Sequence, residues 1–254
     1  MPAPNHSIDI SETGGVRSLH FGSDWVQGAM RIARPWALEL AYTREMMAGL
    51  LLRQESGWPA SALLVGLGAG SLCKFIYRHL PDCRMTVVEI HPDVPAAARQ
   101  FFKLPEDPAR LQIVIDDGAE FVATATTHYD LILVDGFDPD ARAGRLEQTR
   151  FYSDCRQRLS ANGVLVCNLL GRNRGFQASV ERLRTAFDGR AIVFPSSDSG
   201  NAIAFAAAGA PLVCSLDDMR ERAGTLKKDT GLDLFSTISR LQLTQALPQN
   251  RLTL

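Results

Sequence analysis

The chain has 254 residues, of which 46% are hydrophobic and 22% charged, the ordinary composition of a globular protein with one large core. Its formal net charge of −1 gives no reason to expect binding to nucleic acid or to an anionic membrane, and no apolar run has the length of a membrane span. The N-terminal residues lack a signal-peptide pattern, and five cysteines without CxxC spacing predict a reduced, cytoplasmic protein with no metal site.

Residues 1–55 predict a small β-element followed by a helix. Residues 18–32 read as a β-hairpin that turns around Gly22. Pro35 then opens a helical pattern over residues 36–54. This stretch is the first of three segments in the expected organisation.

Residues 56–210 predict the main domain, because short apolar runs alternate there with amphipathic segments. The runs cover residues 62–67, 85–90, 111–115, 129–135 and 163–170. Continuous apolar strands separated by helices are typical of a parallel sheet covered on both faces. Two further runs, 190–195 and 202–208, are joined by a loop too short for a helical crossover, so we expect one antiparallel strand at the sheet edge. The fold class is therefore α/β, a doubly wound and mostly parallel sheet.

Residues 211–254 predict a C-terminal helical extension of the same domain. This segment is rich in charged residues and has a helical pattern. Gly224 and Gly231 are expected to break it.

The first chemical motif follows the strand at residues 62–67, where Gly66, Gly68 and Gly70 lead into a helix. Glycine allows the sharp turn and lets a ligand approach the helix N-terminus. Glu89 ends the next strand, where an acid can accept hydrogen bonds from a ribose diol. A plain strand–helix turn and a solvated acid would explain each feature alone, but together they favour nucleoside binding.

Asp117 and Gly118 end the following strand. The acid could accept a hydrogen bond from an adenine amino group, and the glycine leaves room for the ring. The simpler interpretation is that Asp117 is a helix N-cap. Because the glycines read GxGxG and no second mononucleotide half follows, the series favours an S-adenosylmethionine-type nucleoside over a dinucleotide.

These motifs, together with YDLILVDGFDP over residues 129–139, resemble the spermidine synthase family, the polyamine aminopropyltransferases, over about residues 18–208. SDWVQGAM resembles the family's glutamine hairpin, with Gln27 in the glutamine position, and LELAYTREMM resembles its tyrosine helix, with Tyr42 as the tyrosine. The resemblance implies a methyltransferase-like Rossmann fold of seven strands, preceded by a short β-hairpin element. It also implies that the nucleoside is held by Glu89 and by Asp117-Gly118.

The resemblance further implies that Asp135 is the general base and that Asp138 helps to bind an amine. An ammonium group cannot attack carbon, so a carboxylate must bind it and take its proton. Tyr42 and Asn168 are expected in the same acceptor site. The simpler interpretation of Asp138 is the cap of a turn.

Several positions depart from the family pattern. Ala69 replaces an acid of the glycine loop, Thr43 and Arg44 stand where a histidine and an acid are usual, and Asn168 replaces a glutamine. Four arginines crowd the loops after the strands, where they are either solvated or face the site: Arg142, Arg145, Arg172 and Arg174.

Three functions follow from these observations. The first is an aminopropyltransferase that uses decarboxylated S-adenosylmethionine and an amine acceptor. The second is an S-adenosylmethionine-dependent methyltransferase on the same scaffold, and the third is a nucleoside-binding protein without catalysis. Family members usually dimerise through a larger N-terminal element, so a homodimer is a weaker expectation here.

Overall fold

The structure, a computed structural model, describes residues 7–138, 142–172, 175–197, 200–244 and 247–254. A seven-stranded sheet with the order β6-β5-β4-β7-β8-β10-β9 forms its centre. The strands are β4 (Ser61–Val65), β5 (Arg84–Glu89), β6 (Leu111–Ile115), β7 (Tyr129–Val134), β8 (Leu159–Leu170), β9 (Ala191–Pro195) and β10 (Asn201–Ala207). The predicted fold class and the seven predicted strands of this sheet are confirmed.

The antiparallel strand lies one position inside the sheet edge, so the expected edge position is wrong. β10 pairs antiparallel with both β8 and β9, and β9 is the edge strand. The short connection from β9 to β10 requires antiparallel pairing. The helix between β8 and β9 spans a wider gap, which leaves room for β10 between them.

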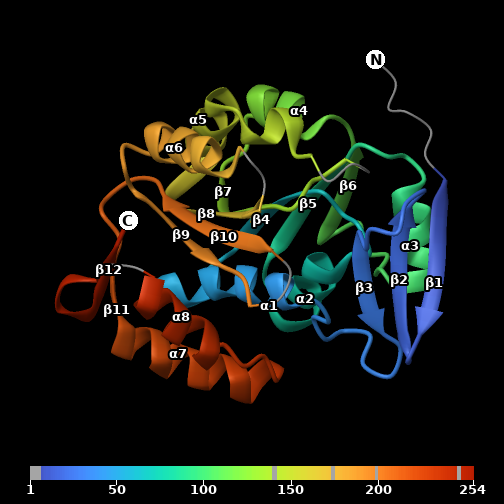
Figure 1. The fold of residues 1–254 in the computed structure, drawn as a ribbon, viewed down its shortest axis with the longest axis horizontal. Helices are drawn as coiled ribbons and strands as arrows, with labels where there is room; N and C mark the ends of the chain where they lie inside the picture. Colours follow the sequence, from blue (N-terminus) through green and yellow to red (C-terminus); the bar gives the residue numbers. More distant parts are fainter. Residues whose placement is uncertain (1–6, 139–141, 173–174, 198–199, 245–246) are drawn as a thin grey trace.

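Helices cover both faces of this sheet (Figure 1). One layer contains α4 (Gly118–Thr124), α5 (Thr149–Arg158) and α6 (Phe176–Ala186); the opposite layer contains α1 (Ala41–Met46) and α2 (Ser71–His79). Residues of β7 alternate between the two cores: Leu131 and Leu133 pack in one, Ile132 and Val134 in the other. Burial on both faces explains why the strand sequences are continuously apolar.

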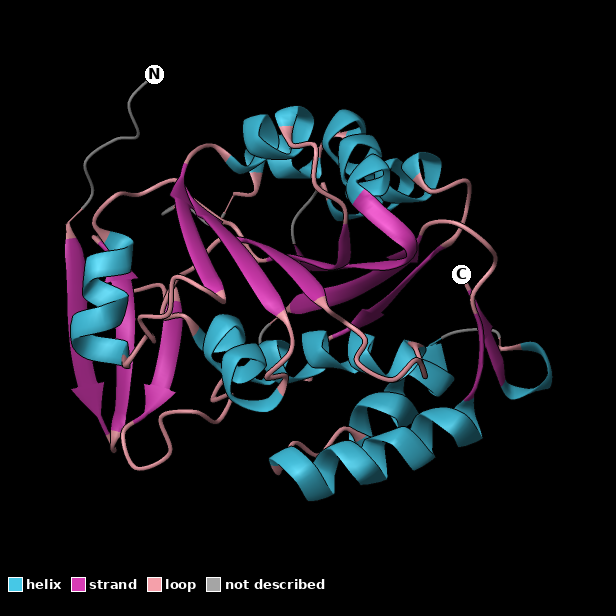
Figure 2. Ribbon diagram, turned by 180° about the vertical axis from the view of Figure 1, so that it is seen from behind, coloured by secondary structure: helices cyan, strands magenta, loops and turns pink. Residues whose placement is uncertain are grey.

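The N-terminal element is a three-stranded antiparallel sheet of β1 (Ile8–Thr13), β2 (Val16–Phe21) and β3 (Gly28–Arg31). The predicted hairpin is β2–β3; β1 was not predicted, because most of its side chains are exposed and its apolar signal is weak. Helix α3 (Val94–Phe102) lies beside this sheet in both views (Figure 2). Arg17 links the two, its Nη1 donating to the carbonyl oxygen of Phe101 at 2.6 Å.

The helix predicted over residues 36–54 is much shorter in the structure. α1 begins at Ala41, because Leu40 has an extended backbone with ψ of 141°, and a 3-10 helix, η1 (Met47–Leu52), follows it. The chain before it is held elsewhere: the carbonyl oxygen of Pro35 accepts a hydrogen bond from Lys74 Nζ at 3.0 Å. The helical prediction was therefore correct for residues 41–52 and wrong for residues 36–40 and 53–54.

The C-terminal segment contains α7 (Leu216–Thr230) and α8 (Phe235–Thr244), followed by η3 (Pro248–Asn250). β11 (Val213–Ser215) and β12 (Arg251–Thr253) form a small sheet. α7 runs through Gly224, so the break predicted there is wrong, whereas Gly231 ends the helix with φ of 78°. A mid-helix glycine costs only about 1 kcal/mol, which the packing of buried Met219 and Ala223 can offset. Across the described ranges, no helix combines the length and hydropathy needed to cross a membrane.

Candidate active site

A cavity of about 370 Å³ lies at the carboxyl ends of β4, β5 and β7 and beside the start of α4. Strands of a parallel sheet end on the same edge, so residues distant in sequence meet there. Eight of the predicted site residues line this cavity: Gln27, Gly66, Gly68, Glu89, Asp117, Gly118, Asp135 and Asp138. A small adjoining cavity of about 20 Å³ is lined by Tyr42 and Ala69 and also by Asp135.

The glycine loop brings the ends of β4 and β7 into close contact. Gly66 has φ of 97°, and a Cβ atom there would lie 2.3 Å from the carbonyl oxygen of Asp135. Gly68 has φ of 51°, and its Cβ would lie 2.9 Å from the carbonyl oxygen of Gln27. Gly70 instead faces the core residue Leu104. The first two glycines therefore shape the cavity wall, and the third allows helix α2 to pack.

Glu89 is held rigidly at the end of β5. Its side chain is buried at 5% exposure, Oε2 accepts from the backbone N–H of Leu67 at 2.9 Å, and Oε1 accepts from that of His91 at 2.9 Å. A carboxylate offers about four lone-pair positions, so two remain for a ligand in the cavity. The carboxylate is thus fixed in place and can still accept hydrogen bonds from a diol.

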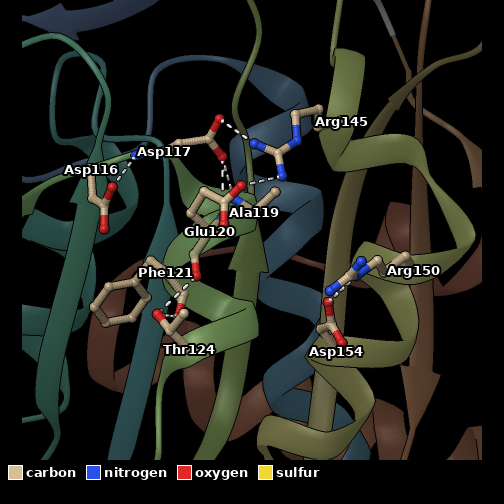
Figure 3. A network of polar contacts seen from close by, with 9 residues as sticks. All are labelled: Asp116, Asp117, Ala119, Glu120, Phe121, Thr124, Arg145, Arg150 and Asp154. Atoms are coloured by element: carbon tan, nitrogen blue, oxygen red, sulfur yellow. Dashed lines mark hydrogen bonds and ion pairs between the residues drawn. The ribbon is translucent and has the colours of Figure 1, made fainter. Parts of the chain in front are cut away.

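Asp117 is the N-cap of α4. Its Oδ1 accepts from the backbone N–H of Ala119 at 2.8 Å, and its Oδ2 accepts from Arg145 at 3.1 Å (Figure 3). Arg145, from η2 (Gly144–Glu147), also pairs with Glu120 at 2.6 Å. The simpler interpretation as a helix cap therefore describes one oxygen of Asp117, and a ligand amino group would share the other with Arg145.

Asp135 lies between two hydrogen-bond donors from different elements. Tyr42 of α1 donates through its hydroxyl to Oδ2 at 3.2 Å, and Asn168 of β8 donates through Nδ2 to Oδ1 at 2.8 Å. Burial raises the pKa of the Asp135 carboxyl, and the hydrogen bonds from Asn168 and Tyr42 offset part of that rise. A fixed carboxylate of raised pKa is well suited to accept a proton.

Asp138 is exposed at the cavity rim, where it closes a turn. Its Oδ1 accepts from the backbone N–H of Arg142 at 2.8 Å, and its own N–H donates to the carbonyl oxygen of Arg142 at 2.9 Å. The turn-cap interpretation thus accounts for part of its environment. Of the four strand-end arginines, Arg142 and Arg145 line the cavity, Arg172 lines a separate groove, and Arg174 lies outside the described residues.

The residues that depart from the family pattern have structural partners. Ala69 is buried against Gly28, so closely that a Cβ on Gly28 would lie 2.6 Å from the Ala69 Cβ. Thr43 donates through Oγ1 to the carbonyl oxygen of Leu40 at 2.7 Å, and Arg44 donates to that of Glu39 at 2.8 Å. The side chains of Thr43 and Arg44 thus stabilise the start of α1.

Asn201 is a residue of this network that the sequence analysis missed. Its Nδ2 donates to Oδ1 of Asn168 at 2.9 Å, which continues the chain of contacts from Asp135. The strand alternation of β10, which places Asn201 on the same face as Ile203, was the available signal. Only the register of β10 against β8, in which Ile203 opposes Asn168, shows that the two amides are diagonal neighbours.

The sequence matches the family described as spermine/spermidine synthase domain over residues 39–171. A polyamine aminopropyltransferase of Neisseria meningitidis serogroup A is 37% identical over 235 residues, which cover 92% of this chain and 89% of that protein.

Two solved structures share the fold. Spermidine synthase from Thermotoga maritima has a TM-score of 0.70 at 21% identity, covering 98% of this chain and 84% of that one. Human methyltransferase-like protein 13, solved in complex with SAH, has a TM-score of 0.67 at 24% identity, covering 76% of this chain and 93% of that one. At these identities the likeness concerns the scaffold, which aminopropyltransferases and methyltransferases have in common.

Proposed function

The chain belongs to the spermine/spermidine synthase family, and on this ground we propose that it transfers an aminopropyl group from decarboxylated S-adenosylmethionine to an amine acceptor in polyamine biosynthesis. The observation that carries the proposal is the partly buried carboxylate of Asp135, held by Tyr42 and Asn168 at the wall of the 370 Å³ cavity. Glu89 would accept from the ribose hydroxyls, with Gln27 and Asp117-Gly118 bordering the rest of the nucleoside. A cytoplasmic location and a homodimer stay predictions.

In the proposed reaction, the acceptor nitrogen attacks the aminopropyl carbon that is bound to the sulfonium sulfur. A new C–N bond forms, the C–S bond breaks, and its electron pair neutralises the sulfur to give a thioether nucleoside. The acceptor nitrogen loses one proton, which Asp135 accepts. Such a displacement requires in-line placement of the two reactants, and a carboxylate fixed at a strand end is suited to hold the amine there.

The direct test is incubation of the purified chain with decarboxylated S-adenosylmethionine and a diamine, followed by mass spectrometry. We expect the thioether nucleoside and the aminopropylated amine in equal amounts. Methylated acceptor from intact S-adenosylmethionine, with no aminopropyl product, would instead favour a methyltransferase. Calorimetry with both donors and both thioether products then ranks their affinities.

Glu89→Gln is expected to weaken nucleoside binding by about 1–3 kcal/mol, the cost of leaving a buried hydrogen-bonding group without its partner. Gln has one acceptor oxygen, so its NH2 group must also face one of the two backbone N–H groups that Glu89 now binds. Titration calorimetry with the thioether nucleoside measures the loss. Glu106→Gln, at a highly exposed acid that does not line the cavity, serves as the matched control and should bind normally. Equal affinity in all three proteins would rule out ribose binding by Glu89.

Ala69→Asp is expected to shift donor preference toward decarboxylated S-adenosylmethionine. The new carboxylate would attract the donor's aminopropyl ammonium and repel the carboxylate of intact S-adenosylmethionine. The ratio of the two dissociation constants, compared between the wild type and the variant, measures the shift. Ala69→Asn introduces nearly the same volume without charge, so it separates the electrostatic effect from crowding against Gly28. A wild-type protein that already rejects intact S-adenosylmethionine completely would contradict this role of Ala69.

The methyltransferase alternative is supported by one specific observation. Ala69 leaves the wall of the small cavity next to Asp135 uncharged at the position where an acid would repel a methionine carboxylate. The retained carboxylate of Asp135, which can bind an attacking ammonium, favours the aminopropyltransferase.

A further inference from the structure

Asn201 makes no hydrogen bond to the carboxylate of Asp135 and does not line the 370 Å³ cavity, yet it ends a chain of hydrogen bonds that reaches Asp135. Asn201 Nδ2 donates to Asn168 Oδ1 at 2.9 Å, and Asn168 Nδ2 donates to Asp135 Oδ1 at 2.8 Å. The three side chains come from β10, β8 and the end of β7, three neighbouring strands of the sheet. Asn168 is 4% exposed, so water has little access to its amide.

The direction of this chain follows from the chemistry of its last member. An ionised carboxylate can only accept hydrogen bonds, so Asn168 must turn its NH2 group toward Asp135. Its carbonyl oxygen then points toward Asn201 and requires a donor, because an unpaired buried polar atom is unfavourable. Asn201 supplies that donor and thereby disfavours the flipped amide, in which an oxygen would face the carboxylate.

We propose that Asn201 is a positioning residue, which fixes the Asn168 amide so that it donates to Asp135 and favours the ionised form of that carboxylate. The proposal rests on the proposed role of Asp135 as the base. It assigns Asn201 no contact with donor or acceptor. Its effect on Asp135 passes through Asn168 alone.

Other groups also act on the Asp135 carboxyl. Tyr42 of α1 donates to the second oxygen, and this contact does not involve Asn168. Among the described residues, the other ionisable side chains that line the same cavity are Glu89, His91, Asp117, Asp138, Arg142 and Arg145, and Cys73 lines the small adjoining cavity. None of these side chains belongs to β8 or β10, so we expect their effect on the Asp135 carboxyl to stay the same when Asn201 is changed.

The decisive variant is Asn201→Leu, which keeps the branching at Cγ and has no hydrogen-bonding group. Without its donor, the buried Asn168 oxygen loses its partner, so the orientation that donates to Asp135 is favoured less strongly and the pKa of the Asp135 carboxyl should rise further. The carbon-13 signal of that carboxyl, assigned by its absence in Asp135→Asn, reports this without any turnover. In kinetics, the acidic limb of kcat/KM should move to higher pH. We expect a loss of about two- to tenfold on that acidic limb, the scale of one ordinary hydrogen bond, and recovery at pH values above the limb.

The variant Asn168→Ala tests whether the effect of Asn201 on Asp135 passes through Asn168. In that background, Asn201→Leu should change neither the carboxyl titration nor the pH profile, because the connecting amide is gone. Gln177→Leu, at an exposed amide on the groove that Asn201 also borders, is the matched control and should behave as the wild type. Asn201→Asp, which preserves shape but faces the Asn168 oxygen with a carboxylate, should shift the titration further in the same direction.

An unchanged Asp135 titration in both Asn201→Leu and Asn201→Asp would overturn the proposal. So would an effect of Asn201→Leu that is equally large in the Asn168→Ala background. A shifted titration with an unshifted kinetic profile has a different meaning: Asn201 positions Asn168 as proposed, but Asp135 is not the base. The two proposals can therefore fail separately.

Discussion

Asp135→Asn is expected to slow turnover by about 10²- to 10⁴-fold, the usual contribution of general acid–base catalysis, while the nucleoside still binds. The amide retains the shape of the carboxylate, and its oxygen can accept from Asn168 while its NH2 group faces the Tyr42 hydroxyl. It cannot take a proton or pair with an ammonium. Single-turnover rates and titration with the thioether nucleoside, measured on the same preparation, check both parts.

The thermal stability of Asp135→Asn tests the raised pKa of the carboxyl independently of turnover. Because burial raises the pKa of the Asp135 carboxyl, the folded protein binds this proton more strongly than the unfolded chain does. Stability is therefore lost as pH rises from the unfolded-state pKa of an aspartate through the raised folded-state value. Asp135→Asn removes that penalty, so its melting temperature at neutral pH should be no lower than that of the wild type.

Asp138→Asn is the comparison variant, because Asp138 lies at the exposed rim and should mainly affect the KM of the acceptor. Normal turnover in Asp135→Asn would show that Asp135 is not the base and only follows the end of β7. Loss of nucleoside affinity would make it a ligand of the donor instead.

Arg240→Met is expected to lower the free energy of unfolding by about 2–4 kcal/mol, because it leaves a buried carboxylate without its ion-pair partner. Glu45, on the same short helix as Tyr42, has a side chain only 4% exposed, and its Oε1 accepts from Arg240 of α8 and from the backbone N–H of Ser197. Its Oε2 has no hydrogen-bond partner among the described residues. Since Arg240 itself remains partly exposed, we place the loss somewhat below that for a fully buried pair. Urea unfolding at neutral pH measures it.

Two further variants test the cause of that loss. Arg150→Met removes an arginine that is 85% exposed and pairs with Asp154 within α5 (Figure 3), so it should leave stability almost unchanged. The double variant Glu45→Met, Arg240→Met removes both charges and should recover much of the stability. If the double variant is as unstable as Arg240→Met alone, the lost packing of the arginine, and not an unpaired charge, is the cause.

The pair also connects the C-terminal segment to the active site. α1 carries Glu45 and Tyr42 one helical turn apart, and Tyr42 donates to Asp135. We therefore expect Arg240→Met to reduce turnover modestly even under conditions where the protein remains folded.

Local sequence patterns were sufficient for most of the fold and for many of the site residues. Apolar runs identified the strands of the main sheet, and parallel strands must bring their carboxyl ends to one edge. Glu89, Asp117 and Asp135 could thus be assigned to one site, because each lies at or just after the carboxyl end of a strand. Strand β1 and the true start of α1 could not be predicted in this way, because neither depends on a periodic apolar pattern.

The sequence by itself determined which residues could meet at this edge of the sheet; the tertiary structure alone decided how they pair. Asn168 lies 33 residues from Asp135 and also 33 from Asn201, while Arg240 lies 195 residues from Glu45. The place of β10 between β8 and β9 aligns the two asparagines, and the packing of α8 against α1 brings Arg240 to Glu45. Hydrogen bonds over such separations depend on strand register and side-chain direction. These are properties of the assembled core, because they arise only when strands and helices pack together.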